Sequence, residues 1–191
     1  MAIKLAGLFY ILNGFSMLVV WPVLIFTGGV PELKTQFIYM VFHLAAEITT
    51  AALGIITGVG LLLKRKWSKP VYFMSSGFFL VAGYLACAYY LFTPGTRSIG
   101  MASMLFGINL IIILLLIQNV RHFYLLPENL TCKIVLLFEG VLLYVLTNVA
   151  GMLFDKGTGY SVCYGWAVIL LMGYTLWNIR RVMKQQFLRT G

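Results

Sequence analysis

Two side chains that can exchange protons, His43 and Glu47, lie four residues apart within a long apolar run. A spacing of four places them on one face of an α-helix. Ionisable groups inside a membrane are costly, which makes them candidates for function. The same face continues through Thr50, Gly54 and Gly58, and the last two form a GxxxG pair that lets a neighbouring helix approach. We therefore predict a helix with one polar side that faces other helices.

The remaining apolar runs contain few polar groups. Glu139 and Asn148 share one run, and Asn13 and Asn109 lie in two others. Glu139 follows Lys133 closely, so it is expected about 9 Å below the membrane boundary at ~1.5 Å per residue. The depth of Glu47 is counted from the opposite boundary of the membrane. The estimated separation of the two acids along the membrane normal is about 10 Å, which disfavours a proton shared between them. The predicted binding or proton site consists of His43, Glu47, Thr50, Glu139, Asn13 and Asn109.

Several kinds of cofactor chemistry do not fit the sequence. The chain has two histidines, His43 and His122, and their expected depths are too different for both to ligate one haem. His43 and Glu47 could supply two metal ligands, but a third and fourth are not evident. Away from their ends, the predicted spans hold no lysine for a Schiff base, and the glycines lack the strand that precedes a dinucleotide-binding turn. We expect no cofactor and no metal ion.

The composition requires lipid around the helices that carry these residues. Of the 191 residues, 61% are hydrophobic and 10% are charged, which is far from the balance of a soluble domain. A helical span needs about 20 apolar residues, and unpaired strand edges are not tolerated in lipid. We therefore predict an all-α integral membrane protein, a single transmembrane domain over residues 1–191. Its six expected spans cover about residues 5–27, 37–63, 71–92, 99–117, 132–154 and 161–182.

The basic residues predict the orientation. Eleven of the fourteen Lys and Arg residues fall in one set of loops and termini, and Lys34, Arg97 and Lys156 fall in the other. Cytoplasmic loops are enriched in Lys and Arg, so we expect both termini in the cytoplasm and the protein in the plasma membrane. The net charge of +9 is explained by these loops, and no basic face interleaved with aromatic residues predicts nucleic-acid binding.

The two halves of the chain share a weak pattern. Asn13 and Asn109, Glu47 and Glu139, and Gly83-Tyr84 and Gly173-Tyr174 occur in the same order, at separations of 96, 92 and 90 residues. Halves of three spans each insert in opposite directions, as in many transporters whose sites lie between inverted repeats. The pattern predicts a 3+3 inverted repeat, and a chance match is the alternative.

The sequence resembles two groups of membrane proteins. His43-Leu-Ala-Ala-Glu47, the glycines that follow it and the basic segment at Trp67 are similar to small multi-span prokaryotic proteins of no assigned function, over roughly the first 118 residues. His43, Glu47, Glu139 and Trp177-Asn178 also resemble the emopamil-binding, sterol-isomerase-like family. That resemblance implies acids in a lipid-facing cavity that protonate a double bond. The chain departs from that family in its additional span and in the adjacency of Trp177 and Asn178.

Three hypotheses for function follow. In the first, the protein binds or transports a small or amphiphilic solute, with proton movement linked to the intramembrane carboxyl groups. In the second, it is a membrane scaffold or partner subunit whose polar residues only hold helices together. In the third, it is a membrane-embedded enzyme that isomerises a lipid. The expected partners are the bilayer and a small-molecule or lipid ligand, and a homo-oligomer is compatible with the sequence.

Overall fold

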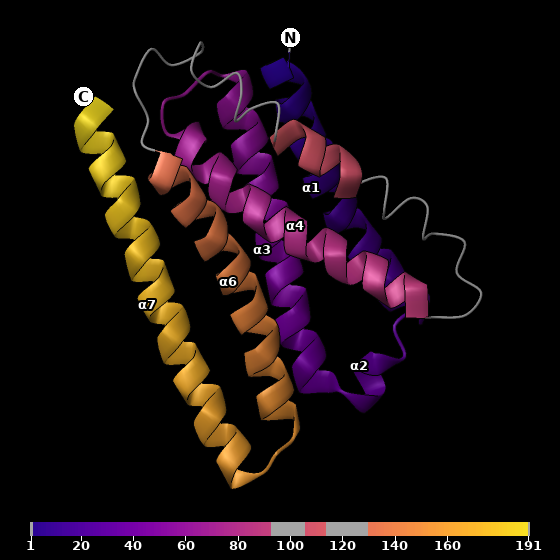
Figure 1. Cartoon of the computed structure of the whole chain (residues 1–191). Coiled ribbons are helices and arrows are strands. Elements are labelled where there is room, and N and C mark those ends of the chain that lie inside the picture. Colours follow the sequence, from indigo (N-terminus) through magenta and orange to yellow (C-terminus); the bar gives the residue numbers. More distant parts are fainter. Residues whose placement is uncertain (1, 93–105, 114–129, 191) are drawn as a thin grey trace.

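The structure is a computed structural model that describes residues 2–92, 106–113 and 130–190 (Figure 1). Its helices are α1 (Ala2–Phe26), the short α2 (Glu32–Thr35), α3 (Phe37–Leu62), α4 (Ser68–Phe92), α6 (Leu130–Asp155) and α7 (Gly159–Thr190). A further helical segment covers residues 106–113, and the described residues contain no strand. The all-α prediction is thus confirmed for the described part of the chain.

Five described helices are long and apolar enough to cross a membrane: Ile3–Phe26, Phe37–Leu62, Ser68–Cys87, Thr131–Asp155 and Gly159–Gln185. They coincide with five of the six expected spans. The other expected span, residues 99–117, lies largely outside the described residues, and its described piece, 106–113, is helical. Long apolar segments fold as helices in lipid because a helix satisfies its backbone hydrogen bonds internally.

The helix ends follow local backbone chemistry. Gly28 has a φ of +71° after α1, where Gly28 N–H donates to the Ile25 carbonyl and Gly29 N–H donates to the Leu24 carbonyl. This pair of bonds closes the last turn and requires a residue that tolerates positive φ, which glycine does without strain. Lys64 adopts a φ of 54° in the equivalent position after α3. Both turns reverse the chain within a few residues, so consecutive helices pack as hairpins.

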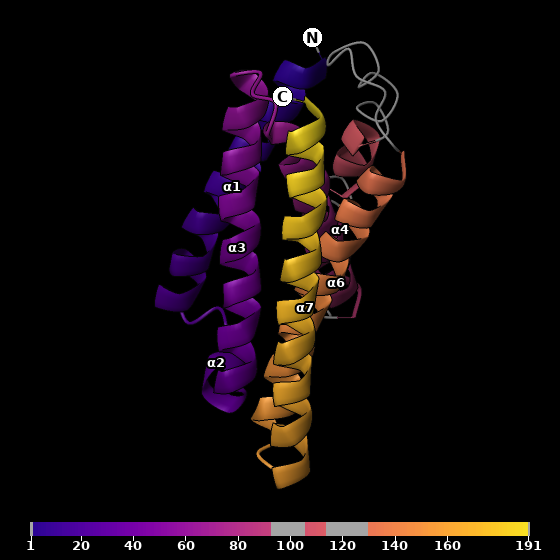
Figure 2. The same cartoon turned by 90° about the vertical axis from the view of Figure 1, so that its left-hand side faces the viewer.

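The helices pack as a bundle with α3 inside it. Helix α3 contacts α1, α4 and α6, while α7 packs on α6. Figure 1 shows α3, α6 and α7 running alongside one another and α4 crossing them obliquely, and Figure 2 shows α1 beside α3 on the side away from α6. Large apolar side chains remain exposed along α1 and α7, where lipid would cover them.

Glycines allow close backbone contact between α1 and α3 and between α4 and α6. A Cβ atom added to Gly58 of α3 would meet the Gly7 carbonyl of α1, and one added to Gly14 would lie 2.6 Å from the Ala51 carbonyl. Where α4 crosses α6, a Cβ at Gly140 would meet the backbone of Met74. Small residues therefore let the backbones touch, as expected for helices that pack in lipid.

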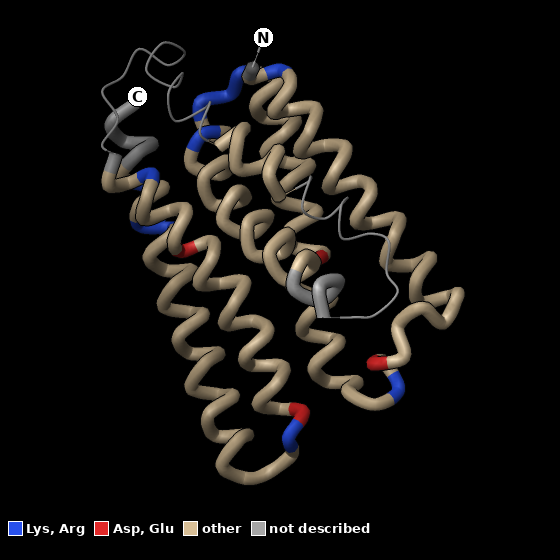
Figure 3. The backbone as a smooth tube through the Cα atoms, turned by 45° about the vertical axis from the view of Figure 1, so that its right-hand side comes forward, with Lys and Arg blue, Asp and Glu red and all other residues tan. Residues whose placement is uncertain are grey.

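Charged residues are distributed unevenly along the bundle. Helix α1 begins and α7 ends at the same end of the molecule, and most described Lys and Arg residues lie toward that end (Figure 3). At the other end, Lys34 and Lys156 each lie close in sequence to an acidic residue, Glu32 or Asp155. The helices between these two ends carry few charges.

Candidate functional site

The polar face of α3 points toward α6. His43 and Glu47, one helical turn apart, each bond to a residue of α6. The His43 Nδ1 atom lies 2.8 Å from Asn148 Oδ1, and the Tyr144 hydroxyl donates a hydrogen bond to Glu47 Oε1. The lower-numbered residue of α3 pairs with the higher-numbered residue of α6. These two bonds therefore require α3 and α6 to run antiparallel.

The amide of Asn148 shows that the ring nitrogen of His43 that faces it carries a hydrogen. Asn148 Nδ2 donates to the Tyr144 carbonyl at 3.1 Å, so Asn148 Oδ1 is the atom that faces the imidazole. An amide oxygen only accepts, and His43 Nδ1–H must therefore be the donor. The Trp21 ring meets the imidazole edge-on with centroids 5.6 Å apart, and the Tyr39 ring stacks on it at 6.1 Å. His43 is held on three sides.

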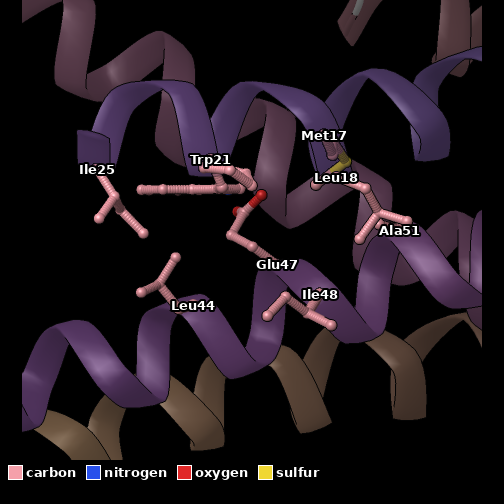
Figure 4. Close-up of a pocket in the computed structure, with 9 residues that line it drawn as sticks. Met17, Leu18, Trp21, Ile25, Leu44, Glu47, Ile48 and Ala51 are labelled. Carbon is pink, nitrogen blue, oxygen red and sulfur yellow. The ribbon is translucent and has the colours of Figure 1, made fainter. Parts of the chain in front are cut away.

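Glu47 also lines a cavity of about 220 Å³ between α1 and α3 (Figure 4). Glu47 is 9% exposed, and Figure 4 shows its carboxyl group reaching from α3 toward α1, beside the Trp21 ring. Among the described residues that line the cavity, it is the one ionisable residue. The other lining residues are apolar: Met17, Leu18, Trp21, Pro22 and Ile25 from α1, and Leu44, Ile48 and Ala51 from α3.

The cavity opens toward the side of the bundle. Leu18, Ile25 and Ile48 line it and are 40%, 41% and 52% exposed, so its rim lies on the outer surface of α1 and α3. In a membrane this surface contacts acyl chains rather than water. The site therefore combines a buried carboxyl group, an aromatic ring and a route from the hydrocarbon.

The other predicted site residues do not reach this cavity. Thr50 donates to the Ala46 carbonyl of its own helix at 2.8 Å, and Asn13 donates to the Phe9 carbonyl of α1 at 2.9 Å. Both bonds are local side-chain-to-backbone bonds of the kind common within helices. Neither residue is among those that line the cavity, so the structure does not bring all six predicted residues together around it.

Asn109 belongs to a separate buried cluster. Its Oδ1 atom accepts a hydrogen bond of 3.0 Å from the Tyr10 hydroxyl, which also lies 2.7 Å from Ser76 Oγ. Tyr10 and Ser76 are completely buried. This cluster joins α1, α4 and the segment 106–113, and its role in the fold is to link these three elements.

Glu139 lies apart from Glu47. The bond to Tyr144 places Glu47 beside that residue of α6. Glu139 lies five residues before Tyr144 on the same helix, a distance of about 7.5 Å at 1.5 Å per residue. Its Oε2 atom is buried without a hydrogen-bond partner among the described residues. The structure thus places the two acids at different depths and gives each a different environment.

Sequence reasoning missed Tyr144 and Trp21 as site residues. Tyr144 and Asn148 are four apart on α6, as His43 and Glu47 are on α3, and this matched spacing was the available signal. Trp21 lies on α1 opposite Glu47, and α1 continues to Phe26 beyond it.

The fold and site define a class of all-helical proteins with several helices long and apolar enough to span a membrane. More particularly, the chain belongs to a domain family of unknown function (DUF8058), whose profile matches residues 1–129. That range includes His43, Glu47 and the whole cavity lining, whereas Tyr144 and Asn148 lie beyond it. No curated protein and no solved structure matches the chain.

Proposed function

We propose that the protein binds a small amphiphilic solute from within the membrane, at Glu47 in the cavity between α1 and α3, and that it transports or presents this solute. The observation that carries the proposal is the Glu47 carboxyl group, which lies in an otherwise apolar, laterally open cavity. A pocket with apolar walls and one well-placed polar group is the usual form of a small-molecule site.

A scaffold function is the second candidate. The bonds from His43 to Asn148 and from Tyr144 to Glu47 join α3 to α6 and could serve only to align these helices. Such an interface between α3 and α6 explains the hydrogen bond to Oε1 of Glu47. It does not account for a carboxyl group that also faces an apolar cavity, because a purely structural interface gains stability by filling that space.

Proton movement belongs to the same proposal. A carboxyl group in the membrane can bind and release a proton as the solute enters and leaves. The titratable groups that face Glu47 are Tyr144 from α6 and His43 on the preceding turn of α3, while α1 presents only apolar side chains and Trp21. Glu47→Gln should then abolish a pH-dependent flux into liposomes while the protein stays folded.

The topology proposed for this function is six crossings of the plasma membrane with both termini in the cytoplasm. Helices α4 and α6 must then run in the same direction, which requires the chain between them to cross back. In support, Phe106 packs near Gly83 of α4, and the Tyr10 hydroxyl contacts both Asn109 and Ser76 of α4. Residues 106–113 therefore run opposite to α4. The concentration of basic residues at one end of the bundle supports the orientation. The inverted repeat stays a prediction.

Native mass spectrometry of the purified protein in mild detergent tests the binding proposal. The wild-type protein should carry a co-purified small molecule or distinct lipid, and Glu47→Gln should lose it. Glu139→Gln is the matched control, because it removes the other intramembrane acid at a position outside the cavity. If wild type and Glu47→Gln are equally empty and the variant is merely less stable, the scaffold function replaces the proposal. Loss of ligand from Glu139→Gln alone would move the site to α6.

A further inference from the structure

We propose that the first turns of α4 and α6, together with the basic turn that precedes α4, bind the phosphate group of an anionic phospholipid. The proposed site lies at the end of the bundle where α1 begins and α7 ends. Lysines on two helices, the N-termini of those helices and a closed basic turn come together there. The site is separate from the cavity at Glu47 and does not depend on what binds in that cavity.

Two lysines from different helices approach each other where α4 crosses α6. Lys69 belongs to the first turn of α4, and Lys133 belongs to the first turn of α6. The Lys133 Nζ atom lies 5.8 Å from the centre of the Phe73 ring, which is one turn of α4 beyond Lys69. The two ammonium groups are close enough to repel each other. A phosphate beside both groups would offset this repulsion through charge-assisted hydrogen bonds.

The pair can be reached from the surface of the bundle. Lys69 is only 6% exposed, so it forms the inner part of the site. Lys133 is half-buried, and its ammonium group therefore forms the outer part. A lysine side chain binds phosphate as a point charge and needs no fixed planar geometry, so the two groups can close around one phosphate from two helices.

The N-termini of the two helices add to the positive charge. A helix N-terminus carries a partial positive charge and N–H groups without helical acceptors, so it favours acidic side chains and bound phosphates. The first turns of α4 and α6 contain no acidic residue, and each contains a lysine. Over residues 64–69 and 128–133 the sequence has five basic residues and one acid, Glu128. Positive charge therefore predominates in these two segments.

The turn between α3 and α4 carries three further basic side chains. Lys64, Arg65 and Lys66 are all exposed. The Arg65 N–H donates to the Gly60 carbonyl at 2.9 Å, and the Ser68 hydroxyl donates to the Arg65 carbonyl at 2.7 Å, so the turn is closed. Lys64 has a φ of 54°, a conformation that glycine adopts with less strain. Backbone strain of this kind is common at functional sites, and here it keeps a basic residue in the turn.

The depth of the site favours a lipid over a soluble anion. The apolar spans of α4 and α6 begin at Ser68 and Thr131, so in a membrane Lys69 and Lys133 lie where the hydrocarbon meets the head groups. Trp67, which precedes α4, is of a type enriched in the same layer. Basic pockets between helices on the cytoplasmic side bind anionic head groups. With the topology proposed above, the ligand comes from the cytoplasmic leaflet.

A lipid titration followed by native mass spectrometry tests the proposal. The delipidated protein in nonionic detergent is titrated with dioleoylphosphatidylglycerol and, in parallel, with dioleoylphosphatidylcholine, which has the same acyl chains and no net charge. Since each lysine near an anionic head group contributes about 1 kcal/mol, the first phosphatidylglycerol should bind at a concentration about ten-fold or more below that of phosphatidylcholine. Ammonium phosphate in large excess should leave the lipid bound.

Equal binding of the two lipids to the wild-type protein would overturn the proposal. Displacement of phosphatidylglycerol by ammonium phosphate would show a site for a soluble anion, and the choice of a lipid would be wrong. Neither comparison requires a substitution, so both can be made whether or not the variants below fold. Both are also independent of any ligand at Glu47, because the two lipids differ only in their head groups.

Two double variants locate the site on α4 and α6. Lys69→Gln with Lys133→Gln removes the pair and should bring phosphatidylglycerol to the level of phosphatidylcholine. Arg65→Gln with Lys66→Gln changes two exposed side chains of the turn and should weaken the preference in part. Because exposed positions tolerate substitution, this second variant tests the site even if the buried Lys69 is needed for folding.

The matched control removes the same number of charges from α7. Arg180→Gln with Lys184→Gln changes two exposed residues of the helix that ends at the same end of the bundle. This variant should keep the full preference for phosphatidylglycerol. If it loses as much of the preference as the variants of α4 and α6, the lipid is attracted by the whole basic end, and the proposed site is wrong.

Discussion

At the scale of single residues, the bond from Tyr144 to Glu47 joins the two halves of the chain at the candidate site. It fixes one oxygen of a carboxyl group that would otherwise be free to rotate toward α1 or α6. Tyr144 is itself completely buried, and the Phe78 ring packs edge-on against it with centroids 5.9 Å apart. The hydroxyl is therefore held in position by packing, and the carboxyl group is positioned in turn.

Removing this hydroxyl should have a measurable but modest effect on stability. Tyr144→Phe keeps the ring and deletes the donor to Glu47, so we expect a loss of about 0.6 kcal/mol, the average for such bonds between membrane helices, with ~1.7 kcal/mol as the upper range. The measurement is reversible unfolding in detergent. Tyr164→Phe is the matched control, since Tyr164 is 64% exposed on α7 and should change nothing. Equal losses from both variants would mean that the hydroxyl of Tyr144 is not a specific partner.

The sequence predicted one half of the site from helical periodicity alone. His43, Glu47 and Thr50 share a face because positions three and four apart coincide on a helix, and the structure has that arrangement. The partners could not be predicted in the same way, because the register between α3 and α6 depends on contacts such as Gly151 against Phe42. Grouping Asn13, Asn109 and Glu139 with Glu47 relied on polarity alone, which indicates burial but not a common location.

At the scale of helices, the bundle depends on glycines, at which the backbone of a neighbouring helix occupies the space that a side chain would fill. The crossing of α4 and α6 is the clearest case, because Gly77 faces the Leu137 carbonyl and Gly140 faces the Met74 carbonyl. The sequence analysis singled out Gly54 and Gly58 of α3 for close packing. It could not single out Gly77 and Gly140, which lack a partner glycine four residues away.

Adding a methyl group at this crossing should separate α4 from α6. Gly140→Ala places a Cβ against backbone atoms of Met74 that cannot rotate away, so we expect a destabilisation of about 1–3 kcal/mol, as for other overpacked sites. The unfolding free energy in detergent is again the measurement. Gly173→Ala on α7 is the matched control, because nothing lies within 4 Å of its added Cβ. A neutral Gly140→Ala would show that the two helices are not in backbone contact.

At the scale of the whole molecule, the α3–α6 pairing bears on the proposed topology of six membrane crossings. Because α3 and α6 are antiparallel, the loop after α3, with Arg65, and the loop after α6, with Lys156, lie at opposite ends of the bundle. If α4 and α6 were joined without a return crossing, α6 would run parallel to α3. The bonds of His43 and Glu47 to Asn148 and Tyr144 could not then both form.

Site-directed labelling can test this topology in cells. In a variant whose three cysteines are replaced, Arg65→Cys and Lys156→Cys each introduce one thiol at an exposed position. With six crossings and cytoplasmic termini, an impermeant maleimide should label the thiol at position 156 in intact cells, and the thiol at position 65 only after permeabilisation. Neither substitution weakens the expected orientation, because Lys64 and Lys66 keep the inner loop basic and the outer loop loses a positive charge. Five crossings would place both thiols on the same side, and the antiparallel contact that forms the site would have to be abandoned.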